Sequence, residues 1–439
     1  MQKKVVKFGG SSLADATQFK KVYDIVKSDS SRKYVVPSAP GKRFKDDTKV
    51  TDMLYSCYSM AAAGDIIDEY FGIIENRYNG IISELGLDMS LEKEYAVIKT
   101  AFAHKAGKDF AASRGEYLNG LILAKYLGFD FIDPAEFIFF TENGVFDAER
   151  TNLALSDELK KHEYAVIPGF YGSMPNDTIK TFSRGGSDIT GSIVARAVGA
   201  DVYENWTDVD GFLMADPRIV EDPKIIEIIT YRELRELSYM GATVLHEDAI
   251  FPVRFAGIPI NIRNTNNPTA KGTLIVATSD KNDGHGVITG LAGKKGFSTL
   301  TIEKDMMNSE LGFCRRVLEV IENNGISFEH MPSGIDTMSV IVSTNEMQEN
   351  KERVLNGIFK AVTPDSMSVE DGIALIAIVG RGMVEAKGTA SRIFSAISKA
   401  GVNIKMIDQG SSELNIIIGI SEDDFETTLK VIYDEFCRN

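Results

Sequence analysis

The sequence predicts an α/β protein in which a mostly parallel open sheet is covered by helices and followed by two small units of another design. Two observations lead to this prediction. Over the first ~290 positions, short apolar runs alternate with helical patterns, as in α/β sheets. Over the remainder of the 439 residues, the order strand, helix, strand, strand occurs twice.

The expected strands of the first part are apolar runs that end in glycine or polar residues. They cover residues 3–10, 33–41, 130–140, 164–172, 200–211 and 258–264. Between them, apolar residues spaced three and four apart predict helices, for example over 18–28 and 113–128. Residues 281–297 are rich in Gly, Lys and Asp, which favours a linker or a surface crossing.

The repeated unit fills the last third of the chain. Its first copy starts with a strand at 297–305 and a helix at 310–325, and its second copy has the matching elements at 374–382 and 390–401. The tripeptide Gly325-Ile326-Ser327 recurs as Gly401-Val402-Asn403. A final amphipathic helix is expected over 423–436.

Composition excludes several classes of function. Asp and Glu number 63 against 48 Lys and Arg, a net charge of −15, which disfavours non-specific binding to nucleic acid. The three cysteines are far apart, so neither a zinc site nor a disulfide framework is expected. The amino terminus does not resemble a signal peptide and no apolar run approaches ~20 residues. We therefore expect a cytoplasmic protein with no membrane partner.

A Gly-Gly turn follows the first strand, in the run Lys7-Phe8-Gly9-Gly10-Ser11-Ser12. Two glycines let the backbone approach a bound anion, and Lys7 would add a positive charge for phosphate oxygens. The run is not a Walker motif, because the lysine precedes the glycines. Taken alone, it is more often a structural turn than a phosphate site.

A second Gly-Gly turn lies at 181–188, where Arg184 can pair with a carboxylate through its two-pronged guanidinium group. Asp188 enters a helix, and it is either a helix cap or a residue that orients a catalytic group. Glu116 lies near the start of another expected helix. It is either an acid that stabilises the amino end of that helix or a ligand for an ammonium group.

Polar residues also end the expected strand at 200–211. Thr207 and Asp208 stand where open α/β sheets contact ligands, and Asp216 and Arg218 follow shortly after. A solvated turn would have a similar composition, and Trp206 is compatible with a plain core position.

Taken together, these segments closely resemble the aspartate kinases of the amino-acid kinase superfamily. The similar motifs are VKFGGSS, FSRGGSD, WTDVDGFLMADPRIV and SYMGATVLHEDAI, in the family's order. The repeat resembles a pair of ACT regulatory modules. The resemblance covers essentially the whole chain. It implies the amino-acid kinase fold, a three-layer α/β/α domain with a mostly parallel open sheet, followed by two ferredoxin-like βαββαβ ACT domains.

The resemblance implies that the chain transfers the γ-phosphoryl group of MgATP to the β-carboxylate of L-aspartate. The product, 4-phospho-L-aspartate, opens the biosynthesis of lysine, threonine, methionine and diaminopimelate. The implied catalytic residues are Lys7, Gly10 and Asp188. Those implied to bind aspartate are Ser38, Thr51, Glu116, Arg184 and Ser187. Those implied to bind ATP are Lys7, Gly9, Gly10, Ser11, Thr207, Asp208, Asp216 and Arg218. No protein side chain is expected to hold the metal, because Mg²⁺ comes with ATP.

Several positions depart from the family pattern. Ser11 replaces a threonine and keeps the hydroxyl, Leu213 stands at a place where some relatives have tyrosine, and Asp52 replaces an asparagine. Thr243 stands where many relatives carry a phosphate-contacting lysine, which puts that side of the phosphate site in question. Lys271 is one nearby candidate to replace it.

The resemblance also predicts the domain organisation. Residues 1–294 would form the kinase domain, 295–370 the first ACT domain, completed by about 425–439, and 371–424 the second. The chain has no further dinucleotide-binding pattern, so the monofunctional form is expected. A homodimer through the ACT domains, which can pair into a tetramer, is the expected assembly.

Lysine is the expected feedback inhibitor, bound between ACT units of two subunits. The residues that resemble an effector site are Met306, Ser309, Phe313, Ser333 and Asp336. The plainer interpretation is that Ser309 caps the next helix and Asp336 only begins a strand. Two other functions remain: another amino-acid kinase, such as a glutamate or carbamate kinase, or a non-catalytic amino-acid sensor.

Overall fold

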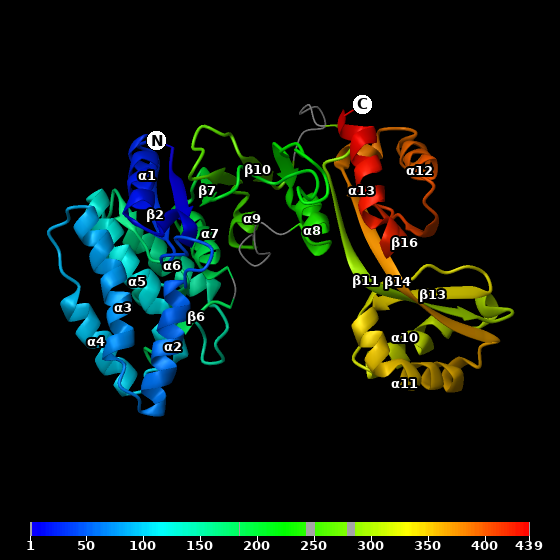
Figure 1. Cartoon of the computed structure of the whole chain (residues 1–439), viewed down its shortest axis with the longest axis horizontal. Coiled ribbons are helices and arrows are strands. Elements are labelled where there is room, and N and C mark those ends of the chain that lie inside the picture. Colours follow the sequence, from blue (N-terminus) through cyan, green and yellow to red (C-terminus); the bar gives the residue numbers. More distant parts are fainter. Residues whose placement is uncertain (1, 184, 243–250, 279–285, 439) are drawn as a thin grey trace. The chain divides into compact units, whose positions relative to one another are not determined.

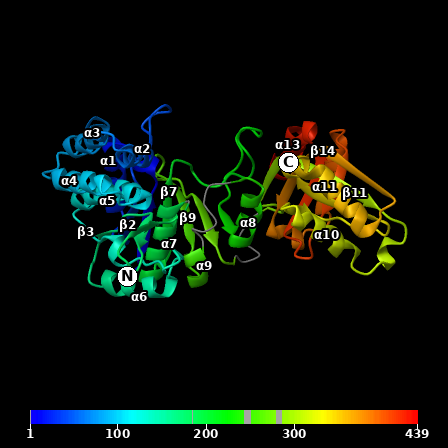
Figure 2. The same cartoon turned by 90° about the horizontal axis from the view of Figure 1, so that it is seen from below.

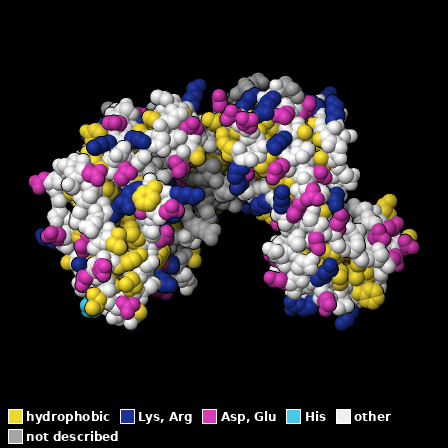
Figure 3. All heavy atoms as spheres, viewed as in Figure 1, with side chains coloured by type: hydrophobic (Ala, Val, Ile, Leu, Met, Phe, Trp, Pro, Cys, Tyr) yellow, Lys and Arg dark blue, Asp and Glu magenta, His cyan; other side chains and the backbone are white. Residues whose placement is uncertain are grey.

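The computed structural model describes residues 2–183, 185–242, 251–278 and 286–438. It divides into two compact units, which we treat separately. The first comprises residues 1–212, 227–231 and 244–279, and the second comprises 213–226, 232–243 and 280–439. Acidic and basic side chains are interspersed on the face of each unit drawn in Figure 3.

The first unit is built on an eight-stranded sheet whose strands run parallel except where β9 meets β10. The strand order is β3-β4-β2-β1-β7-β9-β10-β8. The strands are β1 (Lys4–Phe8), β2 (Arg32–Pro37), β3 (Asp130–Phe131), β4 (Ala165–Val166), β7 (Val202–Thr207), β8 (Ile228–Thr230), β9 (Ile260–Asn264) and β10 (Thr273–Val276). A separate hairpin joins β5 (Tyr171–Ser173) to β6 (Ile179–Thr181).

Helices cover both faces of this sheet (Figures 1 and 2). One layer contains α1 (Ala16–Lys27), α2 (Val50–Ala63), α3 (Asp68–Glu84), α4 (Glu92–Ala103) and α5 (Lys108–Leu127). The other contains α6 (Ala148–Leu159), α7 (Gly186–Val198) and α9 (Phe251–Ala256). Along β1, Val6 and Phe8 belong to the core beneath α1–α5. Side chains alternate along a strand, so Val5 and Lys7 point to the α7 side.

The second unit contains a six-stranded antiparallel sheet of order β12-β13-β11-β14-β16-β15. Its strands are β11 (Gly290–Glu303), β12 (Phe328–His330), β13 (Thr337–Ser343), β14 (Ser366–Val379), β15 (Ile404–Asp408) and β16 (Asn415–Ser421). Its helices are α10 (Phe313–Asn323), α11 (Thr344–Val362), α12 (Thr389–Lys399), α13 (Phe425–Tyr433) and most of α8 (Tyr231–Tyr239).

Two long strands serve both repeats. The carboxyl half of β11 and the amino half of β14 enclose a core with α10 and α11, which we call the first repeat. The amino half of β11 and the carboxyl half of β14 enclose another core with α12 and α13, which we call the second repeat. Each repeat therefore has four strands and two helices, the βαββαβ composition that the sequence predicted.

Two predictions about this part differ from the structure. We expected the C-terminal helix to complete the first repeat, but Phe425, Leu429 and Ile432 of α13 are buried in the core of the second. The first repeat is already complete, because α11 fills that place. We also expected a linker over 281–297, but residues 290–297 belong to β11, where Leu291 and Ala292 are buried against β14.

Candidate active site

A cavity of about 600 Å³ opens at the carboxyl ends of β1 and β2. Six of the predicted site residues line it: Gly10, Ser11, Ser38, Thr51, Glu116 and Asp208. They come from five separate stretches of the chain. Three stretches follow β1, β2 and β7, which end at one edge of the parallel sheet, and Thr51 and Glu116 belong to α2 and α5. A cavity of this size at this edge suits a small polar ligand.

Lys7 and Asp188 form an ion pair below the turn that follows β1. Lys7 Nζ lies 2.6 Å from Asp188 Oδ1, and Lys7 is 7 % exposed. Asn205, which pairs with Lys7 across β1 and β7, donates from Nδ2 to the same Oδ1 at 2.9 Å. Asp188 is therefore held by two groups of the sheet. It does not cap α7, whose cap residue is Gly185.

The turn after β1 has no room for a side chain at Gly10 or at the facing Gly41. The backbone N–H of Gly41 donates to Gly10 O at 2.8 Å, and a Cβ atom on Gly41 would lie 2.5 Å from Gly10 C. A Cβ atom on Gly10 would lie 2.9 Å from Ala39 O. The Gly9 N–H donates to Trp206 O at 3.0 Å, and Trp206 is 1 % exposed in the core. The close approach of backbones thus explains the glycines at 10 and 41.

Glu116 carries the most perturbed carboxyl group of the cavity. Its side chain is buried within α5, and Oε2 has no hydrogen-bond partner. Burial raises the pKa of Glu116 to about 8, against the smaller opposing effect of a hydrogen bond from the Ala39 backbone. A buried carboxyl group with a free oxygen is an unsatisfied acceptor, which a cationic ligand group would satisfy.

Three predicted residues around this region, Ser187, Ser38 and Thr207, have local partners of their own. Ser187 is buried at the start of α7 and packs against Gly169. A Cβ atom added to Gly169 would lie only 2.6 Å from the Ser187 side chain. Ser38 O accepts from Asn119 Nδ2 at 2.7 Å. Thr207 ends β7, and its Oγ1 accepts from the Val209 N–H at 3.3 Å. Arg184 lies outside the described residues.

The loop between β2 and α2 forms one wall of the cavity, and the sequence analysis did not identify it. It contributes Lys42, Arg43, Lys45 and Lys49 to the lining. The sequence does contain a pattern that could have predicted this wall, because four basic residues lie within eight positions. Asn205 was also missed, although an amide inside a buried strand is a recognisable exception to the apolar pattern.

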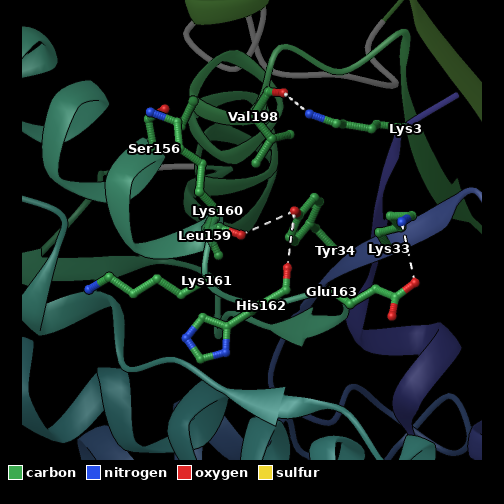
Figure 4. Close-up of a pocket in the computed structure, with 11 residues that line it drawn as sticks. Lys3, Lys33, Tyr34, Ser156, Leu159, Lys160, Lys161, His162, Glu163 and Val198 are labelled. Atoms are coloured by element: carbon green, nitrogen blue, oxygen red, sulfur yellow. Dashed lines mark hydrogen bonds and ion pairs between the residues drawn. The ribbon is translucent and has the colours of Figure 1, made fainter. Parts of the chain in front are cut away.

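A second cavity of about 460 Å³ lies at the opposite edge of the sheet, beside the amino ends of β1 and β2 (Figure 4). Its cations already have partners: Lys33 lies 3.6 Å from Glu163 Oε1, and Lys161 lies 2.6 Å from Glu158 Oε2. Tyr34 Oη donates to the carbonyl oxygen of Leu159, at the end of α6. The carboxyl end of a helix carries partial negative charge, so this cavity suits an anionic ligand less well.

Comparison with known proteins identifies the family. The model of the amino acid kinase family matches residues 2–264, and an ACT domain model matches residues 376–436. Aspartokinase 3 of Bacillus subtilis is 40 % identical over 99 % of this chain and 98 % of its own length. The chain belongs to the aspartokinase family.

Solved structures agree with this assignment. The crystal structure of Clostridium acetobutylicum aspartate kinase is 52 % identical, with a TM-score of 0.91 over 99 % of this chain and 100 % of that one. Aspartokinase III of E. coli, solved with lysine and aspartate, is 24 % identical with a TM-score of 0.72 and covers 100 % of both chains. This more distant likeness shows the shared fold. The expected three-layer kinase domain followed by ACT domains is confirmed.

The remaining predicted aspartokinase residues lie in the second unit. Asp216 and Arg218 pair with each other, with Arg218 Nη2 2.6 Å from Asp216 Oδ2. Leu213, a departure from the family pattern, begins the same segment. Thr243 lies outside the described residues. Within the described ranges, no helix is long and apolar enough to cross a membrane.

The predicted effector residues gather at one end of the first repeat. The Met306 N–H donates to Asp336 Oδ1 at 3.0 Å, and the Ser309 N–H donates to Met306 O within a short 3₁₀ turn. Ser333 is exposed and bridges to Met338 in the strand that follows. Ser309 does not cap α10, because Gly312 holds that position.

Phe313 differs from the other effector candidates. It begins α10, and its side chain is 2 % exposed within the core of the first repeat. Its burial follows from the apolar face of α10, on which Val317 and Ile321 are also buried. In this structure Phe313 is therefore a core residue.

Proposed function

We propose that this aspartokinase transfers the γ-phosphoryl group of ATP to the β-carboxylate of L-aspartate and so produces 4-phospho-L-aspartate. The observation that carries the proposal is the pairing of a buried, unpartnered Glu116 oxygen with a tight glycine turn in one cavity. The first suits the ammonium group of an amino acid, and the second suits phosphate oxygens. This step would open the biosynthesis of lysine, threonine, methionine and diaminopimelate.

In this proposal the amino-acid substrate lies at the Glu116 end of the cavity. Glu116 Oε2 accepts hydrogen bonds from the substrate ammonium. Arg184 binds a substrate carboxylate through its guanidinium fork, which orients the amino acid. Ser38, Thr51 and Ser187 supply hydroxyl groups that fix the position of the substrate. These side chains hold the β-carboxylate toward the turn after β1.

In this proposal the nucleotide phosphates occupy the end of the same cavity that is formed by that turn. Gly9, Gly10 and Ser11 present backbone N–H groups to the phosphates, and Thr207 and Asp208 contact the adenosine part. Lys7 neutralises charge on the transferring phosphoryl group, and Asp188 holds the Lys7 ammonium in place through the 2.6 Å ion pair. Asp216 and Arg218 are assigned to the nucleotide only by resemblance.

The reaction needs little help from acid–base groups. The substrate carboxylate is ionised near neutral pH and attacks as it is, so no side chain has to remove a proton. Positioning and charge neutralisation remain, and phosphoryl transfer depends mainly on these. Lys7 is suited to this task because its charge is buried and already oriented.

We propose that Mg²⁺ enters with ATP. Within the described residues, no group of three or more His, Cys, Asp or Glu is placed to hold a metal ion. The glycine turn and Lys7 fit a nucleotide whose phosphates bring their own cation. When bound, Mg²⁺ would neutralise phosphate charge, the same need that Lys7 meets.

We further propose that lysine inhibits the enzyme through the first repeat, at the interface of a homodimer that can pair into a tetramer. Asp336 would accept the ammonium of lysine, and the 3₁₀ turn at Ser309 would offer N–H groups to its carboxylate. Met306 and Ser333 would border the same site. Inhibition follows only if lysine binds an inhibited arrangement more tightly than the active one.

The test is aspartate-dependent formation of ADP, together with trapping of the acyl phosphate by hydroxylamine. Aspartate should support turnover, whereas glutamate and acetylglutamate should not. A preference for glutamate would place the chain with another amino-acid kinase activity. If none of the three amino acids supports turnover of the nucleotide, the kinase proposal is refuted and a sensor is favoured.

A further inference from the structure

The wall of the active-site cavity formed by residues 42–49 carries positive charge that the proposed roles do not use. Lys42, Lys45 and Lys49 line the cavity and are exposed. In the part of the chain that the structure describes, none of the three forms an ion pair with a carboxylate. Asp46, the other acid at the tip of the loop, does not line the cavity.

The two arginines near these lysines share one carboxylate, Asp47. Arg43 binds both carboxylate oxygens of Asp47, at 2.8 and 3.0 Å, and Arg77 Nη1 lies 2.8 Å from Asp47 Oδ2. These hydrogen bonds, those from Arg43 first, hold the pKa of Asp47 well below its usual range. Asp47 therefore orients both arginines, and the three lysines add positive charge that no carboxylate of the described residues pairs with.

The loop is fixed to the turn after β1. Arg77 is buried and donates to the carbonyl oxygens of Gly41 at 2.7 Å and Ala14 at 2.9 Å. Gly41 in turn donates to Gly10 O at 2.8 Å. The cationic wall thus stands beside the glycine turn before any ligand binds, which limits the ordering cost of binding.

We propose that Lys42, Lys45 and Lys49 bind the phosphate groups of the nucleotide. The acids among the cavity-lining residues are Glu116, whose raised pKa leaves it mostly neutral at pH 7, and Asp208. The lining is therefore net cationic. Phosphates are the matching ligand, because aspartate carries an ammonium that offsets part of its negative charge. Flexible lysines act as point charges, which suits phosphate oxygens in more than one position.

This inference rests on the proposed function, but nucleotide binding can be measured without turnover. We would measure the dissociation constants of ATP and adenosine by calorimetry for the intact chain and for the triple variant K42Q/K45Q/K49Q. The triple variant should bind ATP at least about tenfold more weakly and adenosine equally well. The dependence of ATP affinity on salt should also become shallower.

Two further variants serve as controls. K20Q/K93Q/K125Q removes three exposed lysines elsewhere in the first unit and should leave ATP affinity unchanged. K42R/K45R/K49R keeps the charge and should retain most of the affinity. Thermal unfolding of each variant verifies that it is folded, and single substitutions replace the triple variant should it fail to fold.

Two results would overturn the proposal. One is ATP affinity in K42Q/K45Q/K49Q equal to that of the surface control. The other is weaker binding of aspartate with unchanged binding of ATP, which would assign the loop to the amino acid. Absence of aspartate-dependent turnover in the unmodified chain would instead refute the proposed function, and the ATP measurement would still decide the role of the loop.

Discussion

If Glu116 receives the substrate ammonium as proposed, raising the pH should tighten aspartate binding, because Glu116 must be ionised for this contact. Its pKa of about 8 results from burial. At pH 7 roughly one molecule in ten then has the ionised form, and at pH 8.5 about three in four do. The apparent dissociation constant scales inversely with this fraction, so KM for aspartate should fall about eightfold between these values.

The assay is initial rates against aspartate concentration from pH 7 to 8.5, with saturating MgATP. The ammonium of free aspartate keeps its proton over this range, because its neighbouring carboxylate stabilises the charge. Glu116→Gln is the matched variant. It should raise KM for aspartate about 100-fold or more and abolish the pH dependence. A KM that stays constant from pH 7 to 8.5 in the unmodified enzyme would refute the assignment.

The same shift predicts the stability of the free enzyme. The folded pKa of about 8 exceeds the ordinary glutamate value of 4.5, so between these pH values the folded state holds the proton more tightly. The contribution of Glu116 to the free energy of unfolding is therefore fully present below pH 4.5 and is lost as the pH rises through 8. The total loss is about 5 kcal/mol. Glu116→Gln should consequently raise the melting temperature at pH 8.5 and change it little at pH 5. A lower melting temperature at pH 8.5 would contradict this reasoning.

Three other predictions follow from the site. Lys7→Ala should lower kcat by about 100-fold or more because a buried charge on the transferring group is lost, and near-normal turnover would remove Lys7 from this role. Arg184→Ala should mainly raise KM for aspartate, whereas an increase confined to KM for ATP would assign Arg184 to the nucleotide. Asp336→Ala should keep basal activity and raise the lysine concentration for half-inhibition about tenfold, or 1.4 kcal/mol. Full lysine sensitivity in that variant, or inhibition of the unmodified enzyme by threonine alone, would argue against the effector proposal.

The sequence predicted those site residues that follow a strand within a short motif. Gly10 and Asp208 are of this kind, since strand, turn and polar residue are consecutive and strand ends meet at one sheet edge. Glu116 was predicted by its motif, although its degree of burial was not. Burial depends on packing of α5 against the sheet, which no local pattern specifies.

The lysine loop and Phe313 show two different limits of interpreting the sequence. The place of Lys45 depends on Arg77 of α3, which contacts Gly41 and Asp47 from another part of the sequence. Phe313 was grouped with the effector residues by resemblance, but it lies on the apolar face of α10 and its side chain is buried. Long-range contacts decided the place of the lysine loop, and these are invisible in a single sequence. The burial of Phe313 follows instead from its spacing with Val317 and Ile321 along one helix face.

The shared strands β11 and β14 also have a consequence for how the chain folds. In the first repeat Glu303 pairs with Ser366, and all the elements of that repeat lie between these two strands in sequence. In the second repeat Gly290 pairs with Val379, outside that segment. Once the first repeat has formed, the halves of β11 and β14 that belong to the second repeat are already in register. The entropic cost of bringing these two strands together has then largely been met before the second repeat forms. We therefore expect the first repeat to act as the nucleus from which the second grows.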